Sequence, residues 1–229
     1  MTPKLSIIVP VYNEARTLHL IMQKLHDVFH EETQLIFVND GSKDDSLAIL
    51  QKHACSSDLV LTKANGGKGS AVRMGIPHAE GKWTAIQDAD LEYEPSEILK
   101  LLAFAESHPD TVIFGSRFLQ ENPNIYKRNL WGNKTITAFL NILFKSHLTD
   151  SYTCFKLFPT RVLKDFPLTA QGFELEAELS AWPLKRGIPI YELPISYKPR
   201  RIEEGKKIRA KDALIGALTM LKIRGRRSL

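Results

Sequence analysis

Short apolar runs alternate with helix-like segments through the first half of the chain, and this alternation limits the folds that are open to it. The apolar runs lie at residues 5–9, 35–38, 59–61, 83–86 and 112–114. Helical spacing or helix start signals lie between them, at residues 14–29, 42–45, 67–79 and 95–107. Ser42 is the expected cap of the second helix. Because runs of consecutive apolar residues are typical of strands covered on both faces, the sequence predicts an α/β fold with a Rossmann-like, mostly parallel sheet and flanking helices.

The second half of the chain is less regular. Residues 129–144 and 174–185 have helical patterns, and residues 188–197 are strand-like with two prolines. Residues 213–221 form a last short predicted helix before a basic tail. Since no internal repeat or low-complexity segment divides the chain, we predict a single domain over residues 1–229. Its expected parts are residues 1–118, 119–212 and 213–229.

The composition is that of an ordinary folded domain. Hydrophobic residues make up 43% and charged residues 25% of the 229 positions, which excludes a disordered chain. Cys55 and Cys154 match no metal-binding spacing and are expected to be reduced thiols. No signal-peptide pattern and no apolar run of about 18–20 residues is present, so we expect a cytoplasmic protein that is not integral to a membrane.

The formal net charge is +5, which favours anionic ligands such as nucleotides, phosphates or lipid headgroups. No nucleic-acid-binding motif accompanies this charge, and nucleic acid is not an expected partner. The positive charge is concentrated late in the chain, at Arg200, Arg201, Lys206, Lys207, Arg209, Lys211 and residues 222–227.

Acidic and amide side chains follow three of the predicted strands, at residues 10–14 (PVYNE), 39–42 (NDGS) and 87–92 (QDADLE). Sheets of this kind bind ligands beyond the carboxyl ends of their strands. A single acidic residue after a strand more often caps a helix. Three such groups at one edge favour a binding site.

Asp88 and Asp90 are the sharpest signal in the sequence. Side chains at i and i+2 leave a strand on the same side, and two carboxylates that close repel each other unless a cation lies between them. Hard oxygen ligands suit Mg²⁺ or Mn²⁺. Such an ion could bridge two phosphates and offset the charge of a leaving diphosphate. The alternative is a solvated acidic turn.

Taken in order, these segments resemble the family 2 glycosyltransferases, and within them the dolichyl-phosphate mannose synthase-like branch. The resemblance covers nearly the whole chain. It implies a GT-A fold, with a nucleotide-sugar-binding half at residues 1–118 and an acceptor-side half at 119–212. The segments that carry it are LSIIVPVYNEARTL, FVNDGSKDDS, NGGKGSAVRMG, QDADLEYEP, FGSRF, LTDSYTCFKLF, GFELEAEL and ELPISYKPRRIEEGKKI.

On the donor side, the resemblance implies that Pro10, Tyr12 and Glu14 line the nucleoside pocket. Asp40 is implied to contact the base, and residues 65–69 to form a flexible turn beside the nucleotide.

The resemblance also assigns the phosphate and metal contacts. Lys68 is a candidate phosphate partner, and a solvated loop lysine is the alternative. Asp88 and Asp90 match the acidic motif of the family, with Asp90 as the strongest metal ligand and a catalytic residue. Glu92 occupies a position where relatives place a glutamine as metal ligand, so metal binding and simple exposure to water both stay open.

On the acceptor side, Arg117 matches an arginine between the donor and acceptor phosphates, and Arg128 matches a second one that binds the acceptor phosphate. The resemblance implies that both are catalytic residues. A planar guanidinium suits bidentate contact with a phosphate. Mannose synthases carry a serine four residues after the second arginine, whereas this chain has Gly132, and Asn133 is the candidate replacement. Two further candidates for the acceptor phosphate lie on a late basic loop, Arg200 and Lys207, for which a solvated basic face is the alternative.

The resemblance therefore predicts an inverting enzyme that moves a sugar from a UDP- or GDP-linked donor to a polyprenyl phosphate, such as dolichyl or undecaprenyl phosphate, with Mg²⁺ or Mn²⁺. A family member that glycosylates a hydroxyl group is the first alternative, and it would need a carboxylate base. The candidates for that base are Asp150, Glu174, Glu176 and Glu178. A non-catalytic nucleotide-sugar-binding protein is a second alternative. Nucleotidyl transfer is disfavoured, because no glycine-rich loop follows the first strand.

A lipid acceptor would bring the protein to a membrane surface, on the cytoplasmic face, or to a membrane-protein partner. The helix predicted at residues 129–144 has several apolar side chains that could enter the interface, and residues 222–227 could meet anionic headgroups. A helix packed in the core and a solvated tail are equally open.

Overall fold

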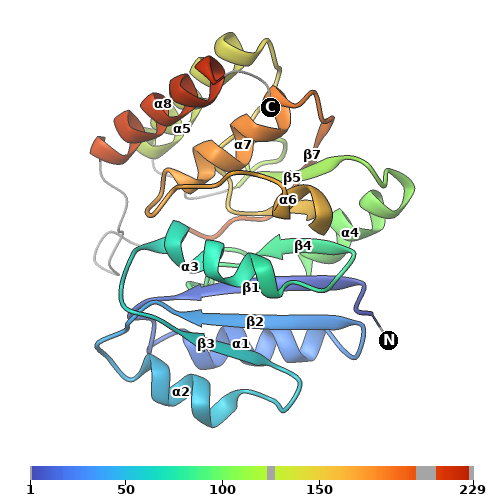
Figure 1. Cartoon of the computed structure of the whole chain (residues 1–229), viewed down its shortest axis with the longest axis vertical. Helices are drawn as coiled ribbons and strands as arrows, with labels where there is room; N and C mark the ends of the chain where they lie inside the picture. The colour runs from blue at the N-terminus through green and yellow to red at the C-terminus, as the bar shows by residue number, and fades with distance from the viewer. Residues whose placement is uncertain (1, 123–126, 200–209, 227–229) are drawn as a thin grey trace.

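The computed structural model describes residues 2–122, 127–199 and 210–226, which form a seven-stranded sheet with helices on both faces (Figure 1). The strands are β1 (Leu5–Val11), β2 (Thr33–Asn39), β3 (Leu59–Thr62), β4 (Trp83–Ile86), β5 (Val112–Ser116), β6 (Lys156–Pro159) and β7 (Ile190–Pro194). The helices are α1 (Leu18–Val28), α2 (Ser46–His53), α3 (Lys68–Gly75), the 3₁₀ turn η1 (Ile76–His78), α4 (Glu97–Ser107), α5 (Lys127–Phe144), α6 (Thr160–Lys164), α7 (Leu175–Lys185) and α8 (Ala210–Gly225).

The strand order is β3-β2-β1-β4-β6-β5-β7. Strands β1 to β4 pair in parallel, and β7 is parallel to β5. Strand β6 is antiparallel to both β4 and β5, so these two run in the same direction. The predicted mostly parallel sheet is thereby confirmed, and the carboxyl ends of every described strand except β6 lie at one edge.

The apolar run in β1 shows why consecutive hydrophobic residues form a strand here. Ile7 packs into one core cluster with α1 and α4, and Ile8 packs into a second cluster with α3 and α7. Both side chains are fully buried. Because side chains alternate between the faces of a strand, a strand covered by helices on both faces must be apolar at every position.

The structure corrects three local predictions and adds two elements that were not predicted. Ser42 does not cap α2; its hydroxyl accepts the Asn13 N–H, and the Asp44 carboxylate accepts the N–H of Ser46, where the helix begins. Strand β6 and the short helix α6 were not predicted. The strand-like stretch at 188–197 narrows to β7, and the last helix is longer than expected, because Met220 and Ile223 bury one side of α8 in the core.

Within the described ranges, no helix combines the length and apolar character needed to cross a membrane.

Candidate functional site

Polar side chains gather at the carboxyl edge of the sheet, as the sequence predicts. Asp40 follows β2, Asp88 lies two residues beyond β4, and Arg117 follows β5. Strand β1, which lies between β2 and β4, brings Tyr12 to the same edge. The parallel direction of these strands places the four residues at one rim.

Asp40 holds the glycine turn at residues 65–67. Its carboxylate is only 2% exposed and accepts the backbone N–H groups of Gly66 and Gly67 at 3.0 and 2.7 Å. The Lys63 ammonium donates to it at 2.7 Å. Gly67 has a φ of +90°, and a Cβ there would stand 2.6 Å from the Gln171 carbonyl oxygen, so only glycine fits this close approach. The structure thus gives Asp40 a role in shaping the turn, and its contact with a base stays a prediction.

Lys68 begins α3 and points into the site rather than into solvent, so the solvated-lysine alternative is wrong. Its Nζ lies 2.8 Å from one oxygen of Asp88 and 3.1 Å from Glu176, and the side chain is 11% exposed. The same Nζ lies 3.1 Å from Cys154 Sγ. Burial alone would lower the pKa of Lys68, but the nearby Asp88, Cys154 and Glu176 raise it well above its ordinary value. The ammonium therefore stays charged beside the acidic turn.

Glu176 connects this lysine to the acceptor side. Its second oxygen lies 2.5 Å from the Nζ of Lys156, which is fully buried at the start of β6. Glu176 is on α7, whereas Lys68 comes 108 residues earlier in the chain. This pair of lysines around one carboxylate joins residues that are far apart in the chain, and no local sequence pattern predicts it.

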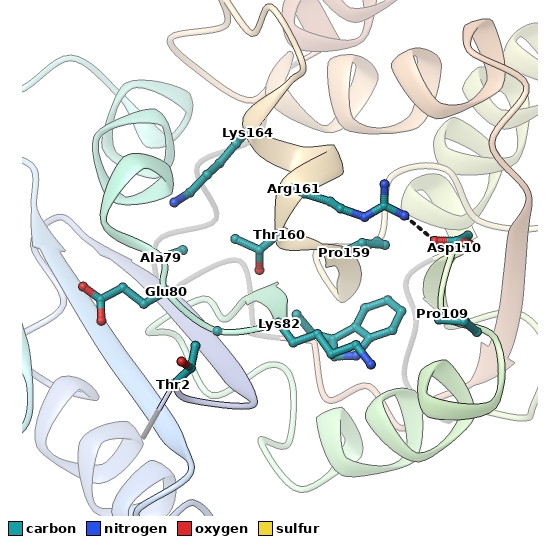
Figure 2. A pocket seen from close by; sticks show the side chains of 12 residues that line it. Thr2, Ala79, Glu80, Lys82, Pro109, Asp110, Pro159, Thr160, Arg161 and Lys164 are labelled. Carbon is teal, nitrogen blue, oxygen red and sulfur yellow. Dashed lines mark hydrogen bonds and ion pairs between the residues drawn. The ribbon is translucent and has the colours of Figure 1, made fainter.

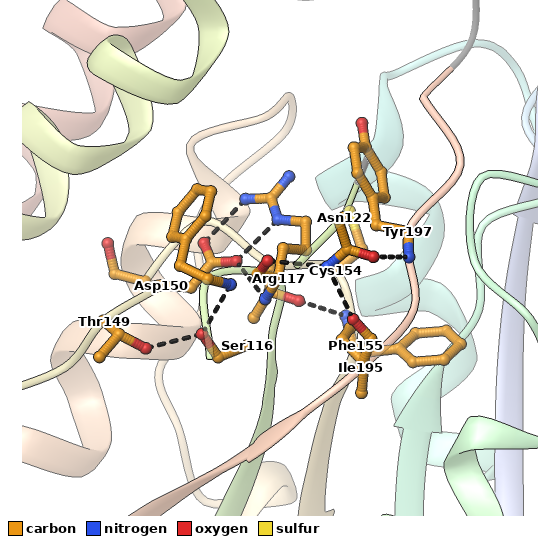
Figure 3. A network of polar contacts seen from close by, with 12 residues as sticks. Ser116, Arg117, Asn122, Thr149, Asp150, Cys154, Phe155, Ile195 and Tyr197 are labelled. Atoms are coloured by element: carbon orange, nitrogen blue, oxygen red, sulfur yellow. Dashed lines mark hydrogen bonds and ion pairs between the residues drawn. The ribbon is translucent and has the colours of Figure 1, made fainter. Parts of the chain in front are cut away.

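Arg117 is held by Asp150 in a bidentate ion pair (Figure 3). Its Nε and Nη2 lie 2.7 and 2.8 Å from the two carboxylate oxygens, and Asp150 is completely buried. Burial would lower the pKa of Arg117, but Asp150 raises it well above the ordinary value. The Glu192 carboxylate accepts the Asp150 N–H at 2.9 Å and so fixes the pair in turn. A permanently charged guanidinium with a fixed orientation results.

Tyr197 links Arg117 to the acidic turn. The guanidinium lies 5.2 Å from the centre of the Tyr197 ring, and the Tyr197 hydroxyl donates to Glu92 at 2.8 Å. Burial and the Glu92 charge raise the pKa of Tyr197, so the phenol remains a donor. Glu92 is therefore not a residue that simply faces water.

The acidic turn offers the donor set that a hard divalent cation requires. Asp88, Asp90 and Glu92 carry only oxygen ligands, and Asp90 accepts the Glu92 N–H at 3.1 Å. Their ligand atoms do not meet in one tight group here. Among the described residues, the one group of three or more His, Cys, Asp and Glu residues whose ligand atoms all lie within 4.8 Å of one another is a different set, which is discussed below. The three acidic residues fit Mg²⁺ or Mn²⁺ by chemistry, and their metal role stays a prediction.

The segment after β1 is tied to the acidic turn. Thr17 donates to the Ala89 carbonyl at 2.9 Å and to the Glu14 carboxylate at 3.3 Å. Pro10, Tyr12 and Glu14 are all partly exposed at this rim. Their contact with a nucleoside stays a prediction.

Several acceptor-side predictions fall outside what the structure describes. The residues concerned are Arg200, Lys207 and, for its side chain, Arg128. Asn133 is partly exposed on α5. A Cβ on the neighbouring Gly132 would meet nothing within 4 Å, so the serine of mannose synthases would fit there.

The four carboxylates proposed as alternative bases all have structural partners. Asp150 pairs with Arg117, and Glu176 with two lysines. Glu178 accepts the N–H groups of Thr169 and Ala170. Glu174 accepts those of Gln171 and Gly172, which lower its pKa although burial opposes this. Each of these carboxylates therefore stabilises a loop or an ion pair.

A hollow of about 720 Å³ lies near the amino end of β4, away from this rim (Figure 2). Its lining includes Lys82, Trp83, Thr160 and Lys164, and Arg161 pairs with Asp110 beside it. None of the predicted site residues lines it.

Comparison with known proteins agrees with this geometry. Residues 6–166 match the family described as Glycosyl transferase family 2. The chain is 30% identical over 196 residues to glycosyltransferase AglJ of Haloferax volcanii, covering 85% of this chain and 63% of that protein. It is 28% identical over 249 residues to dolichyl-phosphate beta-glucosyltransferase of Saccharomyces cerevisiae, covering 96% and 74%. The chain spans 43% to 63% of the length of the first three curated relatives that it matches.

Among solved structures, the chain is similar to glucosyl-3-phosphoglycerate synthase of Mycobacterium tuberculosis in complex with Mn²⁺, UDP and glucosyl-3-phosphoglycerate. The TM-score is 0.76 at 16% identity, with 99% of this chain and 81% of that chain covered. At this identity the likeness concerns the fold alone, and it confirms the predicted GT-A architecture.

Proposed function

Since the chain belongs to glycosyltransferase family 2, we propose that it transfers a sugar from a nucleotide-sugar to a polyprenyl phosphate, with inversion at the anomeric carbon. Relatives named for dolichyl phosphate and undecaprenyl phosphate support this acceptor class. The donor base and the sugar are left open between UDP- and GDP-linked sugars.

The observation that carries the proposal is the fixed charge of Arg117, together with the engagement of all four candidate bases by other groups. A hydroxyl acceptor needs a base, and Asp150, Glu174, Glu176 and Glu178 each hold other groups instead. A phosphate monoester has its second pKa near 6, so at pH 7 it is already a nucleophile and needs none. The arrangement is therefore better suited to a phosphate acceptor.

Arg117 and Asn133 are the proposed acceptor contacts whose side chains the structure describes, and of these two Arg117 carries a charge. Asp150 occupies one edge of its guanidinium, which leaves further N–H groups for a phosphate. Such a cation offsets the repulsion between the acceptor phosphate and the donor diphosphate. The remaining proposed acceptor contacts are Arg128, Asn133, Arg200 and Lys207.

On the donor side, Asp88 and Asp90, with Glu92, would hold Mg²⁺ or Mn²⁺, which supplies charge neutralisation to the departing diphosphate. Lys68 adds a second positive charge to the same place, since it remains protonated next to Asp88. The proposed nucleoside contacts are Pro10, Tyr12, Glu14 and Asp40.

A transfer assay with matched variants tests the proposal. Labelled UDP- and GDP-sugars are offered to the protein with a short polyprenyl phosphate and Mn²⁺, and Asp90→Ala is compared with the wild type. We expect a loss on the order of 10³-fold in turnover, because a preorganised electrostatic contact to the leaving group is removed. Asp110→Ala, an exposed carboxylate beside the distant hollow, should keep normal turnover. Near-normal transfer by Asp90→Ala would refute the metal role.

We further propose that α8 places the protein on a membrane surface. Leu214, Leu218 and Leu221 are 65%, 49% and 48% exposed at spacings of three and four residues, so they form one stripe along the helix. Helix α5 lies beside α8 and exposes Trp131 (Figure 1). Basic residues in the last turn of α8 suit anionic headgroups. Membrane binding would deliver a lipid-linked phosphate to the site.

Vesicle flotation tests the proposed membrane binding of α8. The protein should float with phosphatidylglycerol vesicles, and Leu214→Glu/Leu218→Glu should reduce the floated fraction several-fold. Leu99→Glu, on the exposed side of α4, is the matched control and should float as the wild type does. Equal flotation of the double variant would exclude this surface.

A further inference from the structure

Three metal-ligating side chains meet near the amino ends of the strands, at the opposite end of the sheet from the candidate functional site. His26 is in the last turn of α1, Cys55 follows α2, and Asp58 precedes β3. Their ligand atoms all lie within 4.8 Å of one another. Helix α1 connects β1 to β2, and α2 connects β2 to β3, and these strands are parallel. Each helix therefore runs back along the sheet and ends near the amino end of the next strand. The cluster is therefore separate from Asp88 and Asp90.

Asp58 contacts both His26 and Cys55. Its side chain is 3% exposed, and one oxygen lies 2.8 Å from His26 Nε2. The same oxygen accepts the Cys55 N–H at 2.8 Å, and the Asp58 N–H donates back to the Cys55 carbonyl at 3.0 Å. The turn from 55 to 58 is thus closed in both directions. A carboxylate facing Nε2 favours the tautomer with its proton there, which leaves the lone pair of Nδ1 available.

That lone pair is on the side of the thiol. The distance from His26 Nδ1 to Cys55 Sγ is 3.9 Å. With zinc–sulfur and zinc–nitrogen bonds of about 2.3 and 2.0–2.1 Å, two ligand atoms of a tetrahedral ion stand roughly 3.6 Å apart. A shift of a few tenths of an ångström therefore brings both atoms to a common ion.

We propose that this cluster binds one thiophilic divalent cation of the Zn²⁺ class. Cys55 Sγ and His26 Nδ1 are the direct ligands, and Asp58 orients the imidazole from behind. Water completes the coordination, because Cys55 is exposed. When the metal–sulfur bond forms, the thiol proton passes to solvent. The bound ion joins α1 to the α2–β3 connection across 29 residues of chain.

The nature of the ligands separates this site from the acidic turn. Thiolate and imidazole favour Zn²⁺ and its spectroscopic substitute Co²⁺, whereas carboxylates alone favour Mg²⁺ and Mn²⁺. Excess Mg²⁺ in the assay therefore occupies hard-oxygen sites and leaves the thiol site free. The test reads out metal binding itself, so its failure would say nothing about glycosyl transfer.

The experiment titrates Co²⁺ into the full reduced chain, with excess Mg²⁺, and follows thiolate-to-cobalt charge-transfer absorption. We expect a band that saturates at one ion per chain and disappears when Zn²⁺ is added. Cys55→Ser should abolish it, and Asp58→Asn should weaken binding about 10- to 100-fold. His19→Gln, an exposed histidine on the same helix, is the matched control and should leave the titration unchanged.

A second measurement does not depend on any variant. Zn²⁺ should slow the alkylation of Cys55 by iodoacetamide, as followed by mass spectrometry of the Cys55 peptide. Absence of a saturable cobalt band, a band that persists in Cys55→Ser, or alkylation at an unchanged rate with Zn²⁺ would each overturn the proposal.

Discussion

The two sides of the candidate site are built in different ways. In residues 1–118, the proposed donor side, the polar groups stand directly after strands, so their position follows from short stretches of sequence. In residues 119–212, the proposed acceptor side, the important side chains have partners far away in the sequence: Asp150 holds Arg117, 33 positions earlier, and Glu176 holds Lys68, 108 positions earlier. Local sequence therefore determines the donor side, whereas tertiary packing determines the acceptor side, and substitutions in the two should have different consequences.

The largest effect on stability is expected on the acceptor side, at Asp150. Asp150→Ala leaves the Arg117 guanidinium buried without its partner, and removing one member of a buried ion pair costs about 3–5 kcal/mol. The free energy of unfolding, measured with urea, should fall by that amount. Asp110→Ala, which removes a carboxylate from an exposed ion pair, should change it by less than about 1 kcal/mol. Equal effects would contradict the contrast drawn here.

Lys68 is where the two sides meet, and its replacement should affect the reaction. Lys68→Met should lower kcat/KM for the nucleotide-sugar about a hundredfold, because a charged donor beside the diphosphate position is lost. Lys68→Arg keeps the charge and should recover part of the activity. If Lys68→Met stayed within threefold of the wild type, the lysine would serve only as a structural ion-pair partner.

The smallest effect is expected at Glu174, whose pKa is lowered by the N–H groups of Gln171 and Gly172. Because the pKa is lower in the folded state, the charged carboxylate stabilises the protein at pH values above 4.5, the ordinary carboxyl pKa. This stabilisation is lost as the pH falls through the lowered pKa. At pH 7 the free energy of unfolding should therefore be larger for the wild type than for Glu174→Gln. The difference should be under about 1 kcal/mol, because the carboxylate is partly exposed. It should shrink below pH 4. A difference that is independent of pH would exclude the charge as its source.

The same contrast explains what could be predicted from the sequence. The strands of the donor side follow from consecutive apolar residues, and Asp88 and Asp90 follow from their spacing after a strand. Strand β6 could not be predicted, because it begins with Lys156, a residue that is buried only because Glu176 on a distant helix neutralises it. The roles of Asp150 and Tyr197 were missed for the same reason, since each depends on a partner that is remote in sequence.

The most direct test of the account compares two acceptors that differ only in the phosphate. A polyprenyl phosphate and the corresponding polyprenol are offered with the same labelled nucleotide-sugar, and initial rates are measured from pH 5 to pH 9. We predict transfer to the phosphate alone, with a rate that rises through about pH 6 as the acceptor becomes dianionic and then stays level. Comparable transfer to the polyprenol would contradict the proposed acceptor.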